Sequence, residues 1–364
     1  MTLPAAPSAF APVRTIGIGG TILIAANGMV ASGIFSLPGK LDAAVGMFAP
    51  VLLLLTGLGF VCIALSYADC ARHFERSGGP ILYVGTAFGR FPGFIIGWLN
   101  YISRAVAQGA NANVVVLTAV TLFPAAAGSV ARQAMLVTVF VALTMLNVLS
   151  VRRAIAALAG ITALKLIPLL ILMAAAFITF GTGHAPTIPP VADAAGVALV
   201  ALYAFTGFEV TSLAAGETSN PRRALPIALV GTVVAIGLLY VLVQWAYSAL
   251  GTPNSNAPLV SLGVRIGGTA AGFALGLTVL VSVVGGITVA ILAAPRLDGI
   301  FEVRRGWLSR LLFPGIATAL CIGAASQSKA VEWRTFALFV GAGAMLYWVA
   351  RRASGPSDTV APPR

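Results

Sequence analysis

Charged residues are scarce in this sequence, and the residue types that build metal and catalytic sites are scarcer still. Only 9% of the 364 residues are charged, Asp and Glu together number 10, and there are 2 His and 3 Cys. Cys62, Cys70 and Cys321 lie far apart, which argues against a disulfide framework and a CxxC metal site. The motifs HExxH and GxSxG are absent. We therefore expect no metal, no other cofactor and no enzyme activity.

Apolar residues dominate instead. They make up 59% of the chain, and the mean hydropathy is +0.98. A soluble core cannot bury that much apolar surface, so the composition predicts an all-α polytopic membrane protein surrounded by lipid. The formal net charge of +12 comes from short Lys and Arg clusters between apolar runs, without the interleaved aromatic residues of a nucleic-acid-binding surface. We expect no nucleic acid partner.

Ten apolar runs are long enough to cross a bilayer. Polar segments such as "GTGHAPTIPP" at 181–190 and "GTPNSNAP" at 251–258 separate them and are typical of loops. The predicted spans are 16–37, 48–67, 94–123, 134–149, 154–180, 194–215, 226–250, 267–294, 311–327 and 335–350.

The distribution of Lys and Arg predicts the orientation. If the first residues are cytoplasmic, fifteen of these basic residues lie on the cytoplasmic side and five on the other, as positive-inside loops require. We therefore expect residues 1–13 and 351–364 to be cytoplasmic tails of a protein in the inner membrane of a bacterium.

Two of the ten spans are interrupted. "NGMVASGIFSLPG" at 27–39 places Asn, Gly and Ser inside the first span and Pro directly after it, and "YAFTGFE" at 203–209 interrupts the sixth. The breaks are five spans apart, and an odd number of spans per unit makes the second unit enter from the opposite side. The sequence thus predicts a five-plus-five inverted repeat, with 14–180 as the first repeat, 193–350 as the second, and broken helices 1 and 6.

Three ionisable residues lie at membrane depth. Lys165 and Arg104 are about 18 and 21 Å along their helices from the preceding cytoplasmic arginine, and Glu209 lies beside the second break. A charge at mid-bilayer costs roughly 2.5–3.5 kcal/mol, so we expect these residues to have a purpose. Burial disfavours the charged form of an amine, which makes Lys165 a candidate proton carrier. The alternative is packing with mutual neutralisation, for example of Arg104 by Glu209.

The chemistry of the first break suggests a ligand. An unwound stretch in lipid needs partners for its backbone groups. The half-helix that starts near Ser32 presents amides and a positive dipole end, which suit a carboxylate. The half-helix that ends near Asn27 presents carbonyls, which suit an ammonium group. An α-amino acid carries both groups close together, so the break predicts such a ligand.

Three segments resemble motifs of the amino acid, polyamine and organocation superfamily of transporters, and they occur in the family's order. "GMVASGIFSLPG" is similar to its first-span "G-[SA]-G-I-F…P", and "SYADCARHFERSGGPILYVGTAFGRFPGFIIGW" at 66–98 to its loop "Y-x-E-L…SGG-x-Y-x-Y…FG…GW". "AFTGFEVTSLAAGETSNPRRALPIAL" at 204–229 resembles its sixth-span signature. Asp69 stands where the family usually has Glu, and ten spans replace the usual twelve.

The resemblance implies where an amino acid would bind. Its carboxylate would meet backbone amides after the first break, and its amine would meet carbonyls in both breaks. Tyr203 would be an aromatic gate, Gln108 would face the side-chain pocket, and Gly33 and Gly207 would let the substrate approach the backbone. Ordinary helix packing is the alternative for the two glycines and Tyr203, and a hydrogen bond between helices is the alternative for Gln108. The implied backbone groups are the amides of Ser32, Gly33 and Ile34, with Ala31 at the turn, and the carbonyls of Met29, Tyr203 and Thr206.

The resemblance also implies coupling and gating residues. Lys165 matches a fifth-span lysine of sodium-independent members, where the ammonium stands in for a sodium ion, and we expect Ser282 near it. Glu209 joins this coupling group. Glu217 in "ETSNPRRALP" would pair with a cytoplasmic arginine as an inner gate, although this segment equally fits a helix end with positive-inside charges. Arg104 is the other candidate gating residue.

The sequence therefore predicts a secondary active transporter of amino acids that works by alternating access, without sodium, by proton coupling or exchange. Two alternatives remain: an amine or polyamine exporter or exchanger, and a transporter-like sensor that binds an amino acid without moving it. Protons are possible partners, and the sequence carries no signal for an oligomeric state.

Overall fold

The computed structural model describes residues 14–30, 32–126, 128–147, 151–181, 185–250 and 257–293, with a few positions between 341 and 348. In these ranges the chain is helical, and its extended pairing is a single bridge between Ile16 and Thr218. The α-helices are α1 (Ile18–Met29), α2 (Ser32–Ser36), α3 (Pro38–Val45), α4 (Ala49–His73), α5 (Pro80–Phe88), α6 (Arg90–Leu122), α7 (Ser129–Asn147), α8 (Val151–Phe180), α9 (Val191–Ala204), α10 (Val210–Leu213), α11 (Pro221–Ala249) and α12 (Pro258–Ala293).

The described helices confirm an integral membrane protein, while the ten-span count is not fully tested. Six described segments are long and apolar enough to cross a membrane: Ile18–Ser36, Pro38–His73, Arg90–Leu122, Ala159–Thr179, Pro221–Ala249 and Pro258–Val283. The predicted fourth span is the 19-residue α7, which is not among these six. The predicted ninth span, and all but a few positions of the tenth, lie outside the described residues.

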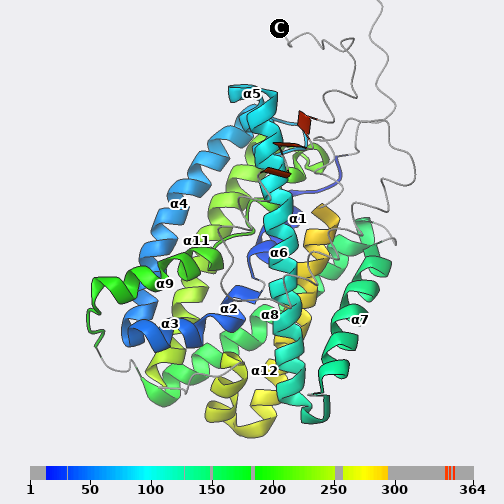
Figure 1. Ribbon diagram of the computed structural model, residues 1–364. Coiled ribbons are helices and arrows are strands. Elements are labelled where there is room, and N and C mark those ends of the chain that lie inside the picture. Colours follow the sequence, from blue (N-terminus) through cyan, green and yellow to red (C-terminus); the bar gives the residue numbers. More distant parts are fainter. Residues whose placement is uncertain are drawn as a thin grey trace, which may run out of the picture. The chain divides into compact units, whose positions relative to one another are not determined.

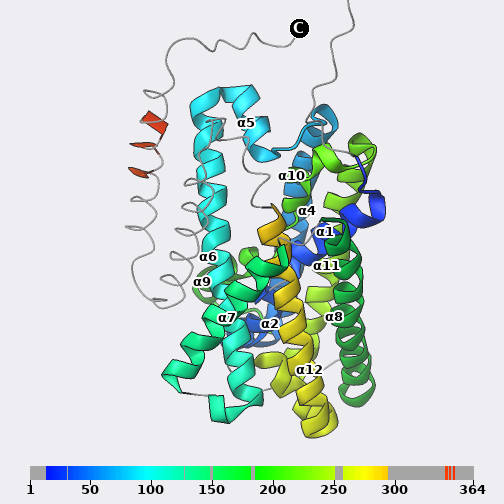
Figure 2. The same cartoon turned by 90° about the vertical axis from the view of Figure 1, so that its right-hand side faces the viewer.

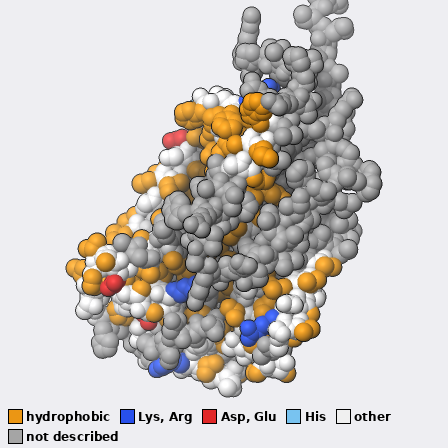
Figure 3. All heavy atoms as spheres, viewed as in Figure 1, with side chains coloured by type: hydrophobic (Ala, Val, Ile, Leu, Met, Phe, Trp, Pro, Cys, Tyr) orange, Lys and Arg blue, Asp and Glu red, His pale blue; other side chains and the backbone are white. Residues whose placement is uncertain are grey.

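The outward faces of these helices are apolar. Leu58 of α4 is 57% exposed and Ile178 of α8 is 87% exposed. Hydrophobic side chains cover much of the described surface in Figure 3. Such faces are stable in contact with lipid tails, because lipid, unlike water, does not disfavour exposed apolar groups.

The chain forms two compact units. The first contains residues 1–79 and 110–296, and the second contains 80–109 and 297–364. In the first unit α4 lies beside α11, and α8 lies beside α12 (Figures 1 and 2). Helix α1 packs against α8, α10, α11 and α12. It is therefore the central helix of this unit.

Both predicted helix breaks are present. Helix α1 ends at Met29, Val30 leaves the helical conformation with φ −80° and ψ 77°, and α2 starts at Ser32. Helix α9 ends at Ala204, and α10 starts at Val210. Between α9 and α10, Gly207 has φ +109°, a conformation that residues with a side chain rarely adopt.

The segment 66–98 was wrongly predicted as a loop. Helix α4 continues to His73, α5 follows, and α6 begins at Arg90. Within the second unit, α5 and the start of α6 turn back on each other at Gly89, which has φ +97°. A Cβ on Gly93 would lie 2.7 Å from Gly85 Cα, so two glycines let these helices touch. The sequence did not predict this hairpin, because the hairpin depends on the contact between Gly85 and Gly93, which no local pattern indicates.

The predicted start of the eighth span, at 267, coincides with a turn inside α12. Helix α12 begins at Pro258 and is interrupted at Gly267 and Gly268, where φ is −134° and +70°. The two parts pack closely, since a Cβ on Gly263 would lie 3.1 Å from Gly272 Cα. The glycines therefore turn the chain, and the second part of α12 begins directly after them, close to the predicted start.

Candidate functional site

The two helix breaks meet backbone to backbone. A Cβ added to Gly28 would lie 2.5 Å from the carbonyl oxygen of Gly207, and a Cβ on Gly207 would clash with the Gly28 carbonyl. A Cβ on Gly33 would lie 3.2 Å from Ala204 Cα. Glycine is therefore required on both sides of the contact. For Gly207, this contact is the close helix packing that we gave above as the alternative to substrate binding. A role of Gly207 in substrate binding stays a prediction.

Side chains from three helices bind the carbonyls at the end of α1. Tyr240 of α11 donates its hydroxyl to Met29 O at 2.7 Å. Lys165 of α8 donates from Nζ to Val30 O at 3.0 Å, and Ser282 of α12 donates to the same oxygen at 3.4 Å. All three side chains are fully buried. Carbonyls that α1 leaves unpaired are thus satisfied by tertiary contacts, as a buried helix end requires.

Lys165 and Ser282 accordingly lie together at the first break, as we expected from the sequence. In the described part of the chain the Lys165 ammonium binds a backbone carbonyl rather than a carboxylate. Tyr240 was not predicted. An aromatic residue in an apolar run carries no local signal that its hydroxyl reaches a carbonyl 211 residues away.

The second break is closed mainly by its own residues. Thr206 donates to Tyr203 O from both its amide, at 3.2 Å, and its hydroxyl, at 2.8 Å. Glu209 accepts the Gly207 amide at 2.8 Å. The side chains of Tyr203 and Thr206 are exposed, and that of Glu209 is half-buried. The Tyr203 carbonyl therefore already has donors, and the Glu209 carboxylate caps an amide of the turn.

The remaining predicted site residues are placed as follows. Gly33 and Ile34 are buried in α2, which begins at Ser32, while Ala31 lies outside the described residues. The first amides of a helix have no acceptor within it, and the binding of a carboxylate by those of α2 stays a prediction.

Gln108 and Arg104 lie on α6, in the second unit. There Arg104 Nε donates to Asn100 Oδ1, one turn earlier, at 2.7 Å. This neighbour within α6 partly satisfies the guanidinium. The roles assigned to Gln108 and Arg104 stay predictions.

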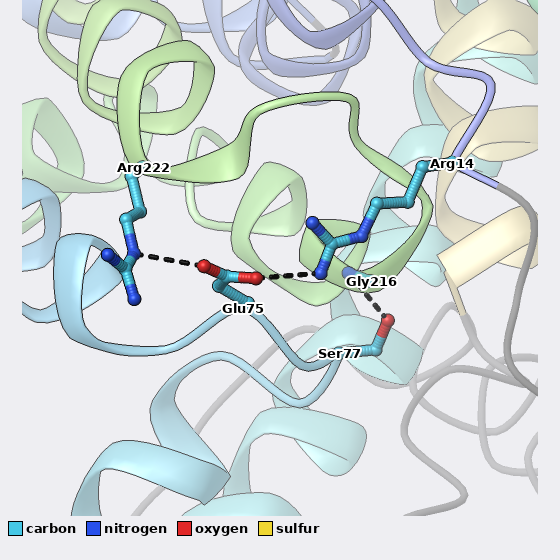
Figure 4. A network of polar contacts seen from close by, with 5 residues as sticks. All are labelled: Arg14, Glu75, Ser77, Gly216 and Arg222. Atoms are coloured by element: carbon cyan, nitrogen blue, oxygen red, sulfur yellow. Dashed lines mark hydrogen bonds and ion pairs between the residues drawn. The ribbon is translucent and has the colours of Figure 1, made fainter. Parts of the chain in front are cut away.

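The segment before α1 is held by a second group of contacts. Glu75, just after α4, accepts Arg14 Nη2 at 2.8 Å and Arg222 Nε at 3.0 Å, and nearby the Gly216 amide donates to Ser77 Oγ at 3.1 Å (Figure 4). The two arginines hold the pKa of the exposed Glu75 carboxyl below its usual value, the hydrogen bond from Arg14 most strongly.

Backbone pairing reinforces these ion pairs. Ile16 N donates to Glu217 O at 3.0 Å, and the Ser219 amide donates to Ile16 O at 2.8 Å. We call Arg14, Ile16, Glu75, Arg222 and the segment 216–219 the N-terminal clamp. Glu217, which we predicted to pair with an arginine as a gate, contributes its backbone carbonyl to this clamp, and its gating role stays a prediction. Glu75 was missed, although an acid in a basic flank, in "RHFERSGG", was a usable signal.

Known proteins share parts of this sequence. An uncharacterized transporter of Mycobacterium tuberculosis is 28% identical over 137 residues, which are 37% of this chain and 28% of that protein. The putrescine transporter PotE of Escherichia coli is 36% identical over 92 residues, 25% of this chain and 20% of the relative. Amino acid transporter protein 6 of Caenorhabditis elegans is 28% identical over 96 residues, 25% of this chain and 18% of the relative. The matched part of the chain thus spans less than a third of the length of each of these relatives.

A family model described as amino acid permease matches residues 16–298, a range that contains both breaks, Lys165, Tyr240 and Ser282. The chain therefore belongs to the amino acid permease family.

Proposed function

We propose that this protein is a secondary transporter that moves amino acids across the membrane by alternating access, without sodium, by proton coupling or exchange. One observation carries the proposal: two interrupted helices face each other, and a buried lysine binds the carbonyl at the first interruption. Broken helices at membrane depth are where transporters of inverted-repeat architecture bind substrate and coupling ions. Membership of the amino acid permease family supports the same reading.

An amino acid fits the polarity of the first break. Its carboxylate would bind the amides of Ser32, Gly33 and Ile34 at the start of α2, with Ala31 at the turn. Its ammonium would bind carbonyls of Met29, Tyr203 and Thr206. Tyr240 and Thr206 already donate to two of these oxygens. A carbonyl oxygen has two lone pairs, so Met29 O can accept one further hydrogen bond, whereas at Tyr203 O the ammonium would have to displace the amide or the hydroxyl of Thr206.

Lys165 is the proposed coupling residue. Its ammonium binds Val30 O together with the Ser282 hydroxyl. A fixed positive charge at this position would repel a sodium ion, so the proposal requires uptake that continues when sodium is replaced by choline. Glu209, beside the second break, is the acidic member of the proposed coupling group.

The N-terminal clamp supports a mechanism in which the two broken helices rock against the other spans. With both termini in the cytoplasm of a bacterial cell, the clamp lies on the cytoplasmic side and joins the end of α4 to the segments before α1 and after α10. Opening toward the cytoplasm would separate these contacts. We assign Glu217 and Arg104 to gating on the same hypothesis, and Tyr203 and Gln108 to the substrate pocket.

Counterflow in proteoliposomes tests the proposal. Purified protein should exchange at least one of twenty labelled amino acids, and a proton gradient should change the rate of net uptake. Loss of uptake when choline replaces sodium would contradict the sodium-independent mechanism. Binding of an amino acid without any exchange would favour a sensor.

A polyamine substrate is the second candidate. Its specific support is the similarity to PotE, named a putrescine transporter, and the carboxylate of Glu209 beside the second break. A diamine has no carboxylate for the amides of α2, which favours the amino acid. Exchange of labelled putrescine without exchange of any amino acid would reverse this preference.

A further inference from the structure

Within the described residues, two buried polar groups near the first break have hydrogen-bonding capacity that is not used. Asn27 is fully buried, and its Nδ2 donates to Leu23 O at 2.9 Å and to Thr162 Oγ1. Its Oδ1 has no hydrogen-bond partner in the described part of the chain. The second group is the ammonium of Lys165, which has three hydrogens and one described acceptor, Val30 O. A buried acceptor without a donor costs about 1–3 kcal/mol, so the pair needs an explanation.

The two groups belong to adjacent layers of the same three helices. In one layer the Val30 carbonyl meets Lys165 of α8 and Ser282 of α12. Asn27 and Thr162 form the next layer, each three residues earlier in its helix. Three residues are about 4.5 Å along a helix, which is within the sweep of a lysine side chain with four rotatable bonds.

The third helix contributes a glycine to this layer. A Cβ on Gly285 of α12 would meet Ile161 Cγ2 at 2.5 Å and would lie 3.6 Å from Asn27 Oδ1, so the Ile161 side chain lies beside this position. Since Gly285 has no side chain, nothing from this position separates the oxygen from the layer that holds Lys165 and Ser282. The orientation of the amide is set by Leu23 O, which accepts a hydrogen and would repel Oδ1.

We propose that Asn27 Oδ1 is a second acceptor for the Lys165 ammonium, so that Asn27 is a positioning residue for this lysine. The lysine then holds the end of α1 at two points, the Val30 carbonyl and the Asn27 side chain. When α1 moves relative to α8, the ammonium keeps an acceptor in the membrane interior instead of becoming unpaired, which is costly in low dielectric. The contact between Asn27 and Lys165 does not depend on the proposed function. Only the coupling role of Lys165 rests on it.

Two variants separate this acceptor role from the Asn27–Thr162 contact. Asn27→Asp and Asn27→Leu both remove Nδ2 and its two bonds, and their side chains are similar in size. They differ in whether an oxygen faces Lys165. We would make each in the natural protein and in a Lys165→Met background, and measure thermal unfolding midpoints of the purified protein in detergent.

We expect the order of the two variants to invert between backgrounds. With Lys165 present, Asn27→Asp should unfold at a higher temperature than Asn27→Leu, because its carboxylate accepts the ammonium. In the Lys165→Met background Asn27→Asp should be the less stable, since it buries a carboxylate without a partner. The same order in both backgrounds would overturn the proposal.

Thr162→Val provides the matched control. It removes the hydroxyl that Asn27 Nδ2 contacts but leaves Oδ1 in place. Its shift in unfolding temperature should be the same with and without Lys165. The order of the unfolding temperatures does not depend on transport. If the wild-type protein showed no counterflow, the proposed function would be refuted, but the comparison of the Asn27 variants would still test the contact with Lys165.

Discussion

The two ends of α1 are held by opposite kinds of contact. At its beginning, the N-terminal clamp uses exposed ion pairs, in which the side chains of Arg14, Glu75 and Arg222 are 45%, 38% and 66% exposed. At its end, Tyr240 and Lys165 bind backbone carbonyls and are fully buried. Water competes for the first set of contacts and is excluded from the second.

This difference indicates which end can be released at low cost. Exposed ion pairs are screened by salt and contribute little to stability, so separating the clamp exchanges protein contacts for water. Separating Tyr240 or Lys165 from its carbonyl would leave buried polar groups unpaired. We therefore expect the beginning of α1 to move and its end at the break to act as the pivot.

The largest effect should follow Gly207→Ala, which places a methyl group in the contact between the two helix breaks. The φ of +109° disfavours any side chain, and the new methyl would clash with the Gly28 carbonyl. We expect a loss of roughly 3 kcal/mol of stability or failure to fold, seen as a large drop in the thermal unfolding midpoint. Gly231→Ala is the control, because a Cβ there meets nothing within 4 Å on α11. An unchanged midpoint for Gly207→Ala would refute the contact.

Lys165→Met should come next and should separate stability from activity. Methionine fills a similar volume without a charge to desolvate, so the protein should stay folded. Counterflow should fall at least about tenfold, equivalent to 1.4 kcal/mol, and the dependence of uptake on the proton gradient should disappear. Proteoliposome assays with and without a gradient measure both. Unaltered gradient dependence would remove Lys165 from the coupling mechanism.

Tyr240→Phe should have a smaller effect, confined to the buried end. It removes the donor to Met29 O and leaves that buried carbonyl one partner short. We expect a loss of about 1–3 kcal/mol in the free energy of unfolding, from denaturant or thermal scans. Thr179→Val is a matched control, because its hydroxyl also donates to a carbonyl, at 2.7 Å, but in an exposed position. Equal losses for the two variants would contradict the contrast between buried and exposed contacts.

Glu75→Gln should have the smallest effect on stability of these variants, but it should make the N-terminal clamp open more often. Both ion pairs lose their charge, yet all three side chains are exposed, so the unfolding midpoint should barely move. A cysteine introduced as Thr218→Cys, at a buried position of the clamp, should react faster with a thiol reagent when Glu75→Gln is present. Mass spectrometry of the labelled peptide distinguishes it from the native cysteines. Equal rates would show that the ion pairs do not hold the clamp.

The pH dependence of the clamp follows from the lowered pKa of Glu75. A carboxyl whose pKa is lower in the folded state stabilises that state above its unfolded pKa, and this contribution disappears as the pH falls through the folded pKa. The labelling ratio of the Glu75→Gln variant to its Glu75 parent should therefore be constant near neutral pH and approach one in acid. A ratio that changed between pH 6 and 8 would point to another titrating group.

Much of the local structure was predictable from residue patterns. Pro38 and the glycines of the first segment marked the first break, and Gly207 marked the second, because glycine and proline change what a backbone can adopt regardless of its surroundings. The depth of Lys165 in an apolar run identified it as a residue in need of a partner. The hairpin at Gly89 and the close packing of the two parts of α12 were not predictable, since both depend on which glycines meet.

Sequence alone therefore determined that the protein is helical, that it lies in a membrane, and where two of its helices break. These properties depend on composition and on local backbone freedom. Tertiary structure decided which groups satisfy the broken ends: Tyr240 for Met29, Lys165 for Val30, and Glu75 for Arg14 and Arg222. Those partners are far apart along the chain and are joined by packing, and the exposure of each site then decides whether its contact is costly or easy to break.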